Sequence, residues 1–178
     1  TLTDRRRPTP VSGLDGGIGA RAIATHGPHV CALRGNGTVA CWGSNSAGEL
    51  GDGTTTSRPS PVAVAGLSGV ASLAVGSAHT CARMADGTVR CWGRNLDGQV
   101  GDGTTTSPRL APVAVPGLTS VVAVAVGGNH SCALLDGGGV QCWGANQLGQ
   151  LRALTPPDSP PPRSVLLNTA TPSLLTGV

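Results

Sequence analysis

The apolar residues of this chain fall into short runs, which glycine and Asp-Gly pairs interrupt every few residues. Residues 72–75, 79–84 and 88–92 are rich in small, β-branched or alternating residues, and each run is bounded by Gly or Asp-Gly. Runs of this length and pattern are typical of strands, whereas an amphipathic helix needs a longer run with apolar positions three and four residues apart. The pattern therefore predicts an all-β protein.

This strand pattern occurs in three tandem copies. The copies contain His-x-Cys-Ala followed by Val-x-Cys-Trp-Gly-x-Asn, and the cysteines recur at offsets of 50 and 51 residues: Cys31, Cys81 and Cys132, then Cys41, Cys91 and Cys142. We place the copies at about residues 8–57, 58–108 and 109–151, after a flank of residues 1–7. About four short strands per 50 residues is the blade pattern of a β-propeller.

The number of copies predicts an incomplete propeller, because propellers close with roughly 4 to 8 blades. We expect antiparallel strands throughout residues 8–151. Residues 72–75 and 121–126 are expected to be inner strands, since small residues suit the crowded propeller axis.

The motifs resemble a known repeat. Gly-Ser-Ala-His-Thr-Cys-Ala at 76–82, Cys-Trp-Gly-Arg-Asn-Leu-Asp-Gly-Gln at 91–99 and Gly-Asp-Gly-Thr at 101–104 resemble the regulator-of-chromosome-condensation repeat, over about residues 8–151. The resemblance implies a seven-bladed propeller. It also implies a family that ranges from a nuclear guanine-nucleotide exchange factor to many bacterial repeat proteins of unassigned role, and the Cys-bearing version here is more similar to the latter.

The end of the chain departs from this pattern. After Leu151 the expected Gly-Asp-Gly-Thr is replaced by Arg-Ala-Leu-Thr, and residues 152–178 are rich in Pro, Ser and Thr without a repeat register. We expect this segment to be a poorly ordered tail or the product of a truncated or frameshifted repeat. We also expect the complete protein to have more blades.

The cysteine pairs all have the spacing Cys-x9-Cys. A three-residue loop at 85–87 would pair Met84 with Thr88, and counting back places Cys81 opposite Cys91. Directly opposite residues at a non-hydrogen-bonded position have Cα atoms about 4.5 Å apart, which permits a disulfide. We therefore expect bridges 31–41, 81–91 and 132–142. Reduced core cysteines and metal ligation with the nearby histidines are the alternatives, although the spacing is not that of a zinc knuckle.

Other residues recur in every copy and are interpreted as structural. They are the histidines two positions before a cysteine (His29, His79, His130), the tryptophans (Trp42, Trp92, Trp143) and the asparagines (Asn45, Asn95, Asn146). A catalytic site is normally built once, which favours packing and hydrogen-bonding roles for a repeated His. We expect the tryptophans to fill the gaps between blades with the indole N–H on a carbonyl, and ligand stacking is the minority alternative.

Composition excludes several classes of function. The net charge is +3 with 12% charged residues, and the sequence shows neither a basic stripe nor an aromatic platform for nucleic acid. The longest apolar run, at 121–126, is far too short to span a bilayer. The Gly-Asp-Gly-Thr loops supply one carboxylate each, too few for a calcium loop. We find no catalytic motif, and we expect no cofactor and no metal.

We therefore expect a non-enzymatic propeller scaffold that binds a protein or a glycan through its loops, as part of a larger extracytoplasmic protein. The alternatives are a guanine-nucleotide exchange factor for a small GTPase, and a propeller hydrolase or lyase whose site lies in missing blades. A cytoplasmic protein with reduced cysteines is the alternative location. The first residue is Thr, which leaves an upstream signal segment undecided. Uncovered sheet faces predict self-association.

Overall fold

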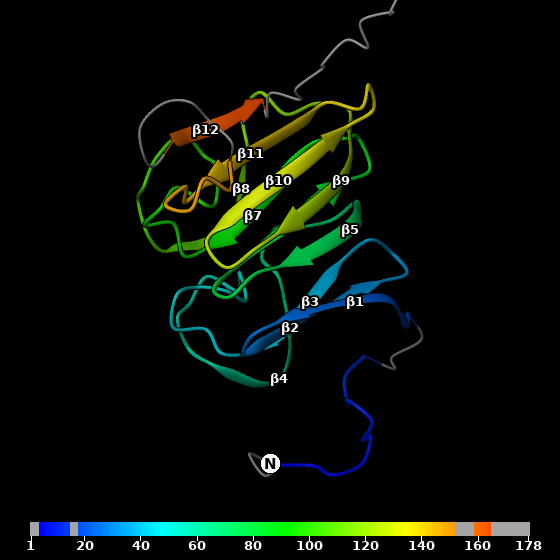
Figure 1. Ribbon diagram of the computed structural model, residues 1–178. Helices are drawn as coiled ribbons and strands as arrows, with labels where there is room; N and C mark the ends of the chain where they lie inside the picture. The colour runs from blue at the N-terminus through cyan, green and yellow to red at the C-terminus, as the bar shows by residue number, and fades with distance from the viewer. Residues whose placement is uncertain (1–3, 15–17, 152–158, 165–178) are drawn as a thin grey trace, which may run out of the picture.

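The structure, a computed structural model, describes residues 4–14, 18–151 and 159–164. These ranges contain strands and no helix, and the strands form three four-stranded antiparallel sheets (Figure 1). The first sheet contains β1 (Ala20–His26), β2 (His29–Arg34), β3 (Val39–Gly43) and β4 (Arg58–Ala63). The second contains β5 (Val70–Val75), β6 (His79–Met84), β7 (Val89–Gly93) and β8 (Arg109–Ala114). The third contains β9 (Val121–Val126), β10 (His130–Leu135), β11 (Val140–Gly144) and β12 (Ser159–Ser164). This confirms the prediction of an incomplete all-β propeller.

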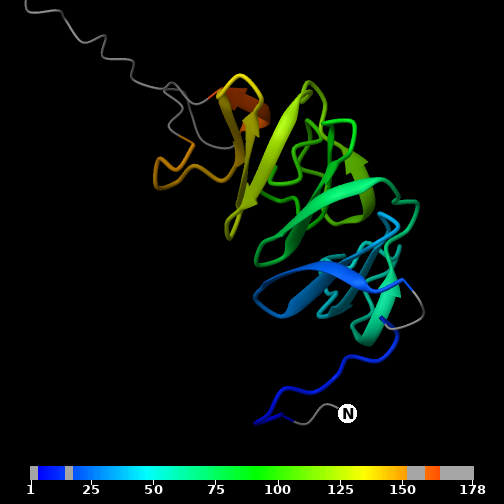
Figure 2. The ribbon, with the colours of Figure 1, turned by 90° about the vertical axis from the view of Figure 1, so that its right-hand side faces the viewer.

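The sheets are stacked in chain order, and their first strands lie nearest to one another. β1 contacts β5, and β5 contacts β9, whereas the fourth strand lies at the opposite edge of each sheet. Figure 2 shows the three sheets one above the next from the side. β5 and β9 are therefore the inner strands, as their small residues predicted.

The sheets are offset from the sequence copies. β4 and β8, the fourth strands of the first two sheets, come from the beginning of the next copy, because they start at Arg58 and Arg109. Both strands contain proline, which lacks an N–H for a second neighbour and so is tolerated at a sheet edge. The Pro-rich entry of each copy therefore completes the preceding blade.

This offset explains two corrections to the sequence-based expectations. Residues 8–14 form no strand, although strands were expected from residue 8. Arg-Pro-Thr-Pro-Val at 7–11 repeats Arg-Pro-Ser-Pro-Val of β4, but the described residues form no sheet ahead of the first blade with which it could pair. At the other end, Ser159–Ser164 forms β12 and pairs with β11, within a segment expected to have no strand. Its prolines are compatible with a position at the edge of the sheet. The sequence did not predict this strand, because the segment does not follow the repeat pattern. The remaining tail lies outside the described residues.

The hydrophobic core consists of two layers, each between neighbouring sheets. One layer packs Leu33, Leu50 and Leu67 of the first blade against Met84 and Trp92 of the second. The other layer repeats this arrangement between the second and third blades, with Val100, Leu118 and Trp143 among its members. Each blade is thus stabilised by its neighbours and not by a core of its own.

Candidate functional site

Each blade has two different faces, which meet at the junctions between sheets. We call the side toward the preceding blade the leading face and the side toward the following blade the trailing face. The leading face carries the tryptophan, and the trailing face carries the histidine and the cysteine pair, as their alternation along the strands predicted. Among the described residues there are therefore two complete junctions, and no further described sheet packs on the leading face of the first blade or on the trailing face of the third.

The cysteines form three disulfides, one within each blade. The bridges are Cys31–Cys41, Cys81–Cys91 and Cys132–Cys142, with Cα–Cα distances of 4.1 Å in each. In all three hairpins the two cysteines are direct partners in the register. These are the pairs that the hairpin count predicted, and they leave no free cysteine.

The histidines of the first two blades bind across the junctions. His29 Nε2 lies 2.9 Å from Thr80 Oγ1, and His79 Nε2 lies 2.9 Å from Ser131 Oγ. Each hydroxyl donates its one proton to a carbonyl of the preceding blade, Glu49 O at 3.1 Å or Gln99 O at 2.9 Å. The hydroxyls must therefore accept from the histidines, so both rings carry their proton on Nε2.

These two rings are neutral at physiological pH. Burial lowers the pKa of His29 to about 4, with a further lowering by His26. Burial also lowers the pKa of His79 to about 3, with smaller contributions from the other three histidines. Each ring is neutral, is buried between two blades and reaches no open cavity. We therefore assign His29 and His79 a structural role, in which each hydrogen-bonds the neighbouring blade.

The tryptophans reinforce the same junctions. Trp92 donates its indole N–H to Glu49 O at 2.8 Å, and Trp143 donates to Gln99 O at 2.9 Å. Both side chains are fully buried. A Cβ on Gly51 would lie 2.8 Å from Trp92 Nε1, and one on Gly101 would lie 2.5 Å from Trp143 Nε1. Only glycine leaves room for the indole, so each junction combines a glycine, a carbonyl and a tryptophan.

The asparagines fold the loop between the third and fourth strands, which we call the interblade loop. Asn45 Nδ2 donates to Asp52 Oδ1 and to the carbonyls of Thr54 and Thr56, while its Oδ1 accepts from Leu50 N. Asn95 makes the equivalent bonds, and Asn146 Oδ1 accepts from Leu151 N. These residues hold the loop that supplies the junction carbonyl.

Two ion pairs that sequence reasoning missed close the same loops. Arg58 Nε lies 3.0 Å from Asp52 Oδ2, and Arg109 pairs with Asp102 in the second loop. Burial opposes ionisation of both aspartates, but hydrogen bonds from the following threonine and from the arginine lower the pKa of each. The signal was the repetition of an arginine after each Gly-Asp-Gly-Thr run.

No residue cluster with the form of a catalytic or metal centre occurs in the described part of the chain. Within residues 4–14, 18–151 and 159–164, no three His, Cys, Asp or Glu side chains are placed to hold a metal ion. These residues also include no helix, and hence none that could span a lipid bilayer.

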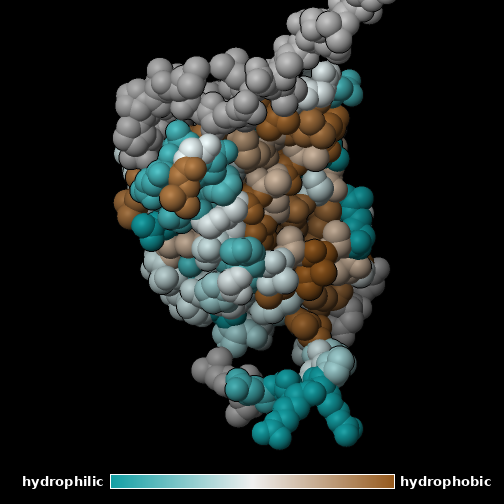
Figure 3. Space-filling view, in the orientation of Figure 1, coloured by the Kyte–Doolittle hydropathy of each residue, from teal (hydrophilic) through white to brown (hydrophobic). Residues whose placement is uncertain are grey.

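The uncovered surfaces are the remaining candidates for binding. Figure 3 shows apolar residues along the side of the molecule where β9, β5 and β1 lie, and Ile23 on β1 and Val122 on β9 are 67% and 45% exposed. Leu96 and Leu148, at the tips of the second and third interblade loops, are 59% and 93% exposed.

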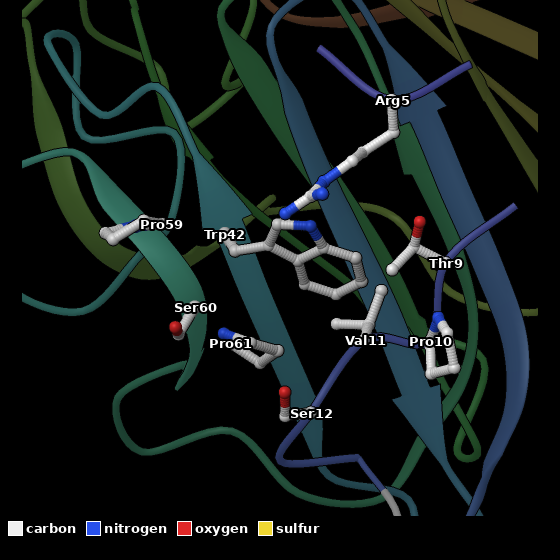
Figure 4. Close-up of a pocket in the computed structure, with 9 residues that line it drawn as sticks. All are labelled: Arg5, Thr9, Pro10, Val11, Ser12, Trp42, Pro59, Ser60 and Pro61. Atoms are coloured by element: carbon white, nitrogen blue, oxygen red, sulfur yellow. The ribbon is translucent and has the colours of Figure 1, made fainter. Parts of the chain in front are cut away.

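The leading face of the first blade is hollowed. A cavity of about 510 Å³ lies between Trp42, β4 and the N-terminal segment, and Figure 4 shows Val11 beside the indole and Arg5 pointing toward it. A second cavity of about 410 Å³ is lined by Pro28, Gly43, Ser44 and residues 57–59. Trp42 is half-buried, and its indole N–H has no acceptor among the described residues corresponding to Glu49 O or Gln99 O. His130, on the trailing face of the third blade, likewise has no hydroxyl partner among the described residues like those of His29 and His79.

The similarities to known proteins agree with this architecture. Residues 36–83 and 86–134 match the family described as Regulator of chromosome condensation (RCC1) repeat, and residues 70–99 and 121–150 match a second family of the same description. A 64-residue stretch is 45% identical to E3 ubiquitin-protein ligase HERC2 of Homo sapiens, and it amounts to 36% of this chain and 1% of the ligase.

Solved structures resemble the whole array of blades. Human WBSCR16 matches with a TM-score of 0.79 and 25% identity, over 90% of this chain and 43% of that chain. Yeast RCC1 (Prp20), solved with Kap60 bound, matches with a TM-score of 0.76 and 24% identity, over 85% of this chain and 38% of that chain. The chain thus spans less than half the length of each of these proteins. Since the RCC1 repeat matches cover more than half of its residues, the chain belongs to the regulator of chromosome condensation (RCC1) repeat family.

Proposed function

We propose that this chain is part of a non-enzymatic, extracytoplasmic RCC1-type propeller that binds a protein partner through its interblade loops. The observation that carries the proposal is that the repeated polar residues have structural roles. His29, His79, Asn45 and Asn95 are all engaged in bonds that hold loops or junctions together. Catalysis needs a differentiated cluster of acid, base and electrophile, and these repeated residues supply none.

The loop tips support a binding role. Leu96 is a large apolar residue that packs against no core, and exposed apolar residues on loops of a rigid scaffold are common contact points for partners. The yeast RCC1 (Prp20) structure contains bound Kap60, which favours a protein over a glycan as the class of ligand.

The disulfides support an oxidising compartment, because such bonds persist outside the reducing cytosol. Acid quenching of native cells, followed by alkylation in denaturant and mass spectrometry, tests this location directly, because the denaturant exposes the buried cysteines. We expect no alkylated cysteine, and six alkylated cysteines in the quenched protein would place it in a reducing compartment.

Crosslinking tests the binding role. A photoreactive residue at Leu96 should crosslink a partner from the native extracellular fraction, and one at the exposed Ala85, in the hairpin turn at the other end of the same blade, should not. The crosslinked species must also be lost when unlabelled chain competes. A glycan array with the folded chain provides the second arm. Saturable glycan binding without a protein crosslink would overturn the choice of a protein partner.

Guanine-nucleotide exchange is the second candidate, favoured by the similarity to yeast RCC1 (Prp20), whose binding to Gsp1p has been characterised. We propose that this chain lacks the activity, since the repeats keep a spacing of 50 and 51 residues with no inserted segment to act on a GTPase. A fluorescent-nucleotide release assay against small GTPases tests this. Release clearly above the intrinsic rate would make exchange the leading function.

A further inference from the structure

We propose that Asn36, at the tip of the hairpin between β2 and β3, is an acceptor for an N-linked glycan, in preference to the second Asn-x-Ser/Thr motif of the chain. The proposal rests on the extracytoplasmic location proposed above, because this modification belongs to secreted proteins. It goes beyond that location by assigning a covalent modification to one side chain.

The acceptor motif is Asn-x-Ser/Thr, where x is any residue except proline. The sequence contains it twice, at residues 36–38 and 129–131. The three asparagines of the interblade loops lack it, since the residues two positions after them are Ala, Asp and Leu. A motif this short also occurs by chance, so the surroundings of each asparagine have to distinguish the two copies.

Asn36 presents its amide nitrogen to solvent. The residue is exposed at the tip of the turn, and its Oδ1 accepts from Thr38 N at 3.1 Å and from Thr38 Oγ1 at 2.7 Å. Nδ2, the atom that would carry the glycan, has no hydrogen-bond partner among the described residues. The amide nitrogen and the hydroxyl of the motif therefore lie together on one short surface turn.

The second blade shows that the turn itself does not require an asparagine. Asp86 stands at the same position, and its Oδ1 accepts from Thr88 N at 2.9 Å and from Thr88 Oγ1 at 2.7 Å. The third blade builds a turn of the same length with Gly137 at this position and Gly139 in place of the threonine. An oxygen acceptor therefore suffices for the turn, and the amide nitrogen of Asn36 is left for another role.

The second motif has a different explanation. Ser131 is fully buried, and its hydroxyl accepts from His79 and donates to a carbonyl in the second junction. Thr80 has the same two bonds in the first junction, although the residue two positions before it is Ala78. The junction thus accounts for Ser131 without any modification. Because the buried hydroxyl is closed to a transferase, we expect Asn129 to be a much poorer acceptor.

A glycan on Asn36 would leave the proposed binding end of the blade free. The Leu33–Val39 pair of β2 and β3 lies next to the turn, whereas the His29–Gly43 pair lies at the end where the interblade loop begins. Asn36 and the interblade loop are therefore at opposite ends of the first blade. A bulky, hydrophilic glycan at the turn is compatible with a partner held at the loops.

The reaction needs two co-reactants, an oligosaccharide linked to a lipid pyrophosphate and its membrane-bound transferase. Asn36 Nδ2 loses a proton and forms a bond to the anomeric carbon of the first sugar. The bond from that carbon to the pyrophosphate oxygen breaks, and the lipid pyrophosphate leaves with the electron pair. Nothing is oxidised or reduced, so the glycan and the disulfides can form in the same compartment.

Peptide mapping of the native protein tests the site. Trypsin separates the two motifs into peptides 35–83 and 110–152, since Arg58 precedes a proline and resists cleavage. An amidase that removes N-linked glycans converts the glycosylated asparagine to aspartate, which heavy-oxygen water labels. Digestion without the amidase controls for spontaneous deamidation of the Asn-Gly bond. We expect labelled aspartate at position 36 and unmodified asparagine at position 129.

Unmodified Asn36 in native protein with oxidised cysteines would overturn the proposal. Reduced cysteines would contradict the proposed location instead, and a second experiment then decides the acceptor site without it. The full chain is secreted from cultured animal cells behind a cleavable signal segment, as wild type and as four variants: Asn36→Gln, Thr38→Val, Thr38→Ser and Asn129→Gln. Thiol counting on the secreted protein is the control for folding.

The glycan mass should be lost in Asn36→Gln and in Thr38→Val, which removes the hydroxyl of the motif. It should be retained in Thr38→Ser, which keeps that hydroxyl, and in Asn129→Gln. A secreted, oxidised wild-type chain without a glycan on Asn36 would overturn the site. Equal occupancy of Asn129 would overturn the preference for the hairpin turn.

Discussion

Lowering the pH from 7 to 5 should destabilise this protein by about 4 kcal/mol through His29 and His79. Both rings are buried at a junction, where each donates from Nε2 to a hydroxyl, and both Nδ1 atoms are buried without a partner. Protonation would place a positive charge on a nitrogen that has no acceptor. The folded state therefore resists a proton that the unfolded chain binds readily.

The size and sign follow from the pKa values. An unfolded histidine has a pKa of about 6.5, whereas burial lowers the pKa of His29 to about 4 and that of His79 to about 3. Between these values the unfolded state binds more protons, so stability falls as the pH drops below 6.5 and stops falling at the folded pKa. At pH 5 each ring contributes about 2 kcal/mol. Asp52 and Asp102 have lowered pKa values and lose their contribution only below 3.8, outside this window.

Urea unfolding followed by circular dichroism, at half-unit steps from pH 8 to 5, measures the effect with the disulfides intact. The double variant His29→Gln, His79→Gln should lose most of the pH dependence whatever its absolute stability, and the exposed His26→Gln should keep it. A wild-type stability that is flat across this range, or a slope that survives the double substitution, would refute the assignment of these rings as neutral junction donors.

Three further changes test the junctions and the blades. Thr80→Val should lower the free energy of unfolding by about 2 kcal/mol in urea melts, because the His29 ring loses its buried partner and Glu49 O loses one of its two donors. Gly51→Ala should lower the free energy of unfolding by roughly 3 kcal/mol, since its Cβ would lie 2.8 Å from Trp92 Nε1. The control Gly53→Ala is also at positive φ but in open space, and should lower it by about 1 kcal/mol. Equal losses of stability in the two variants would contradict the packing argument. Reduction with dithiothreitol should cost about 2 kcal/mol for each bridge, and thermal melts with thiol counting would show whether stability falls in step with the thiols released.

The blade architecture could be predicted because the same sequence pattern occurs three times, so each copy supports the interpretation of the others. A period of about 50 residues with Asp-Gly turns and Cys pairs at one spacing specifies hairpins whose register can be counted from the loop, and Cys81 does lie opposite Cys91. The direction of the tryptophans followed from the alternation of side chains along a strand. Local rules sufficed for these features because each involves residues within one hairpin.

What could not be predicted depends on contacts between copies. The fourth strand of each of the first two sheets comes from the next copy, so Arg58 appeared to begin a blade when it completes one. β12 was missed because its segment has no repeat register, and residues 8–14 were expected to be strand because their missing partner sheet is not visible in sequence. The hydroxyls of Thr80 and Ser131 were also missed, since their role appears only when His29 and His79 of the preceding blades lie beside them.

The positions that depart from the repeat therefore carry the information about assembly. Thr80 and Ser131 differ chemically only by a methyl group, and both bridge a histidine to a carbonyl. Val30 breaks that series on the leading face of the first blade, and Trp42 is the one of the three tryptophans whose indole N–H has no carbonyl acceptor among the described residues. The repeated histidines and tryptophans of the two complete junctions are engaged with a neighbouring blade, so a position that breaks the repeat changes the chemistry of the face that carries it.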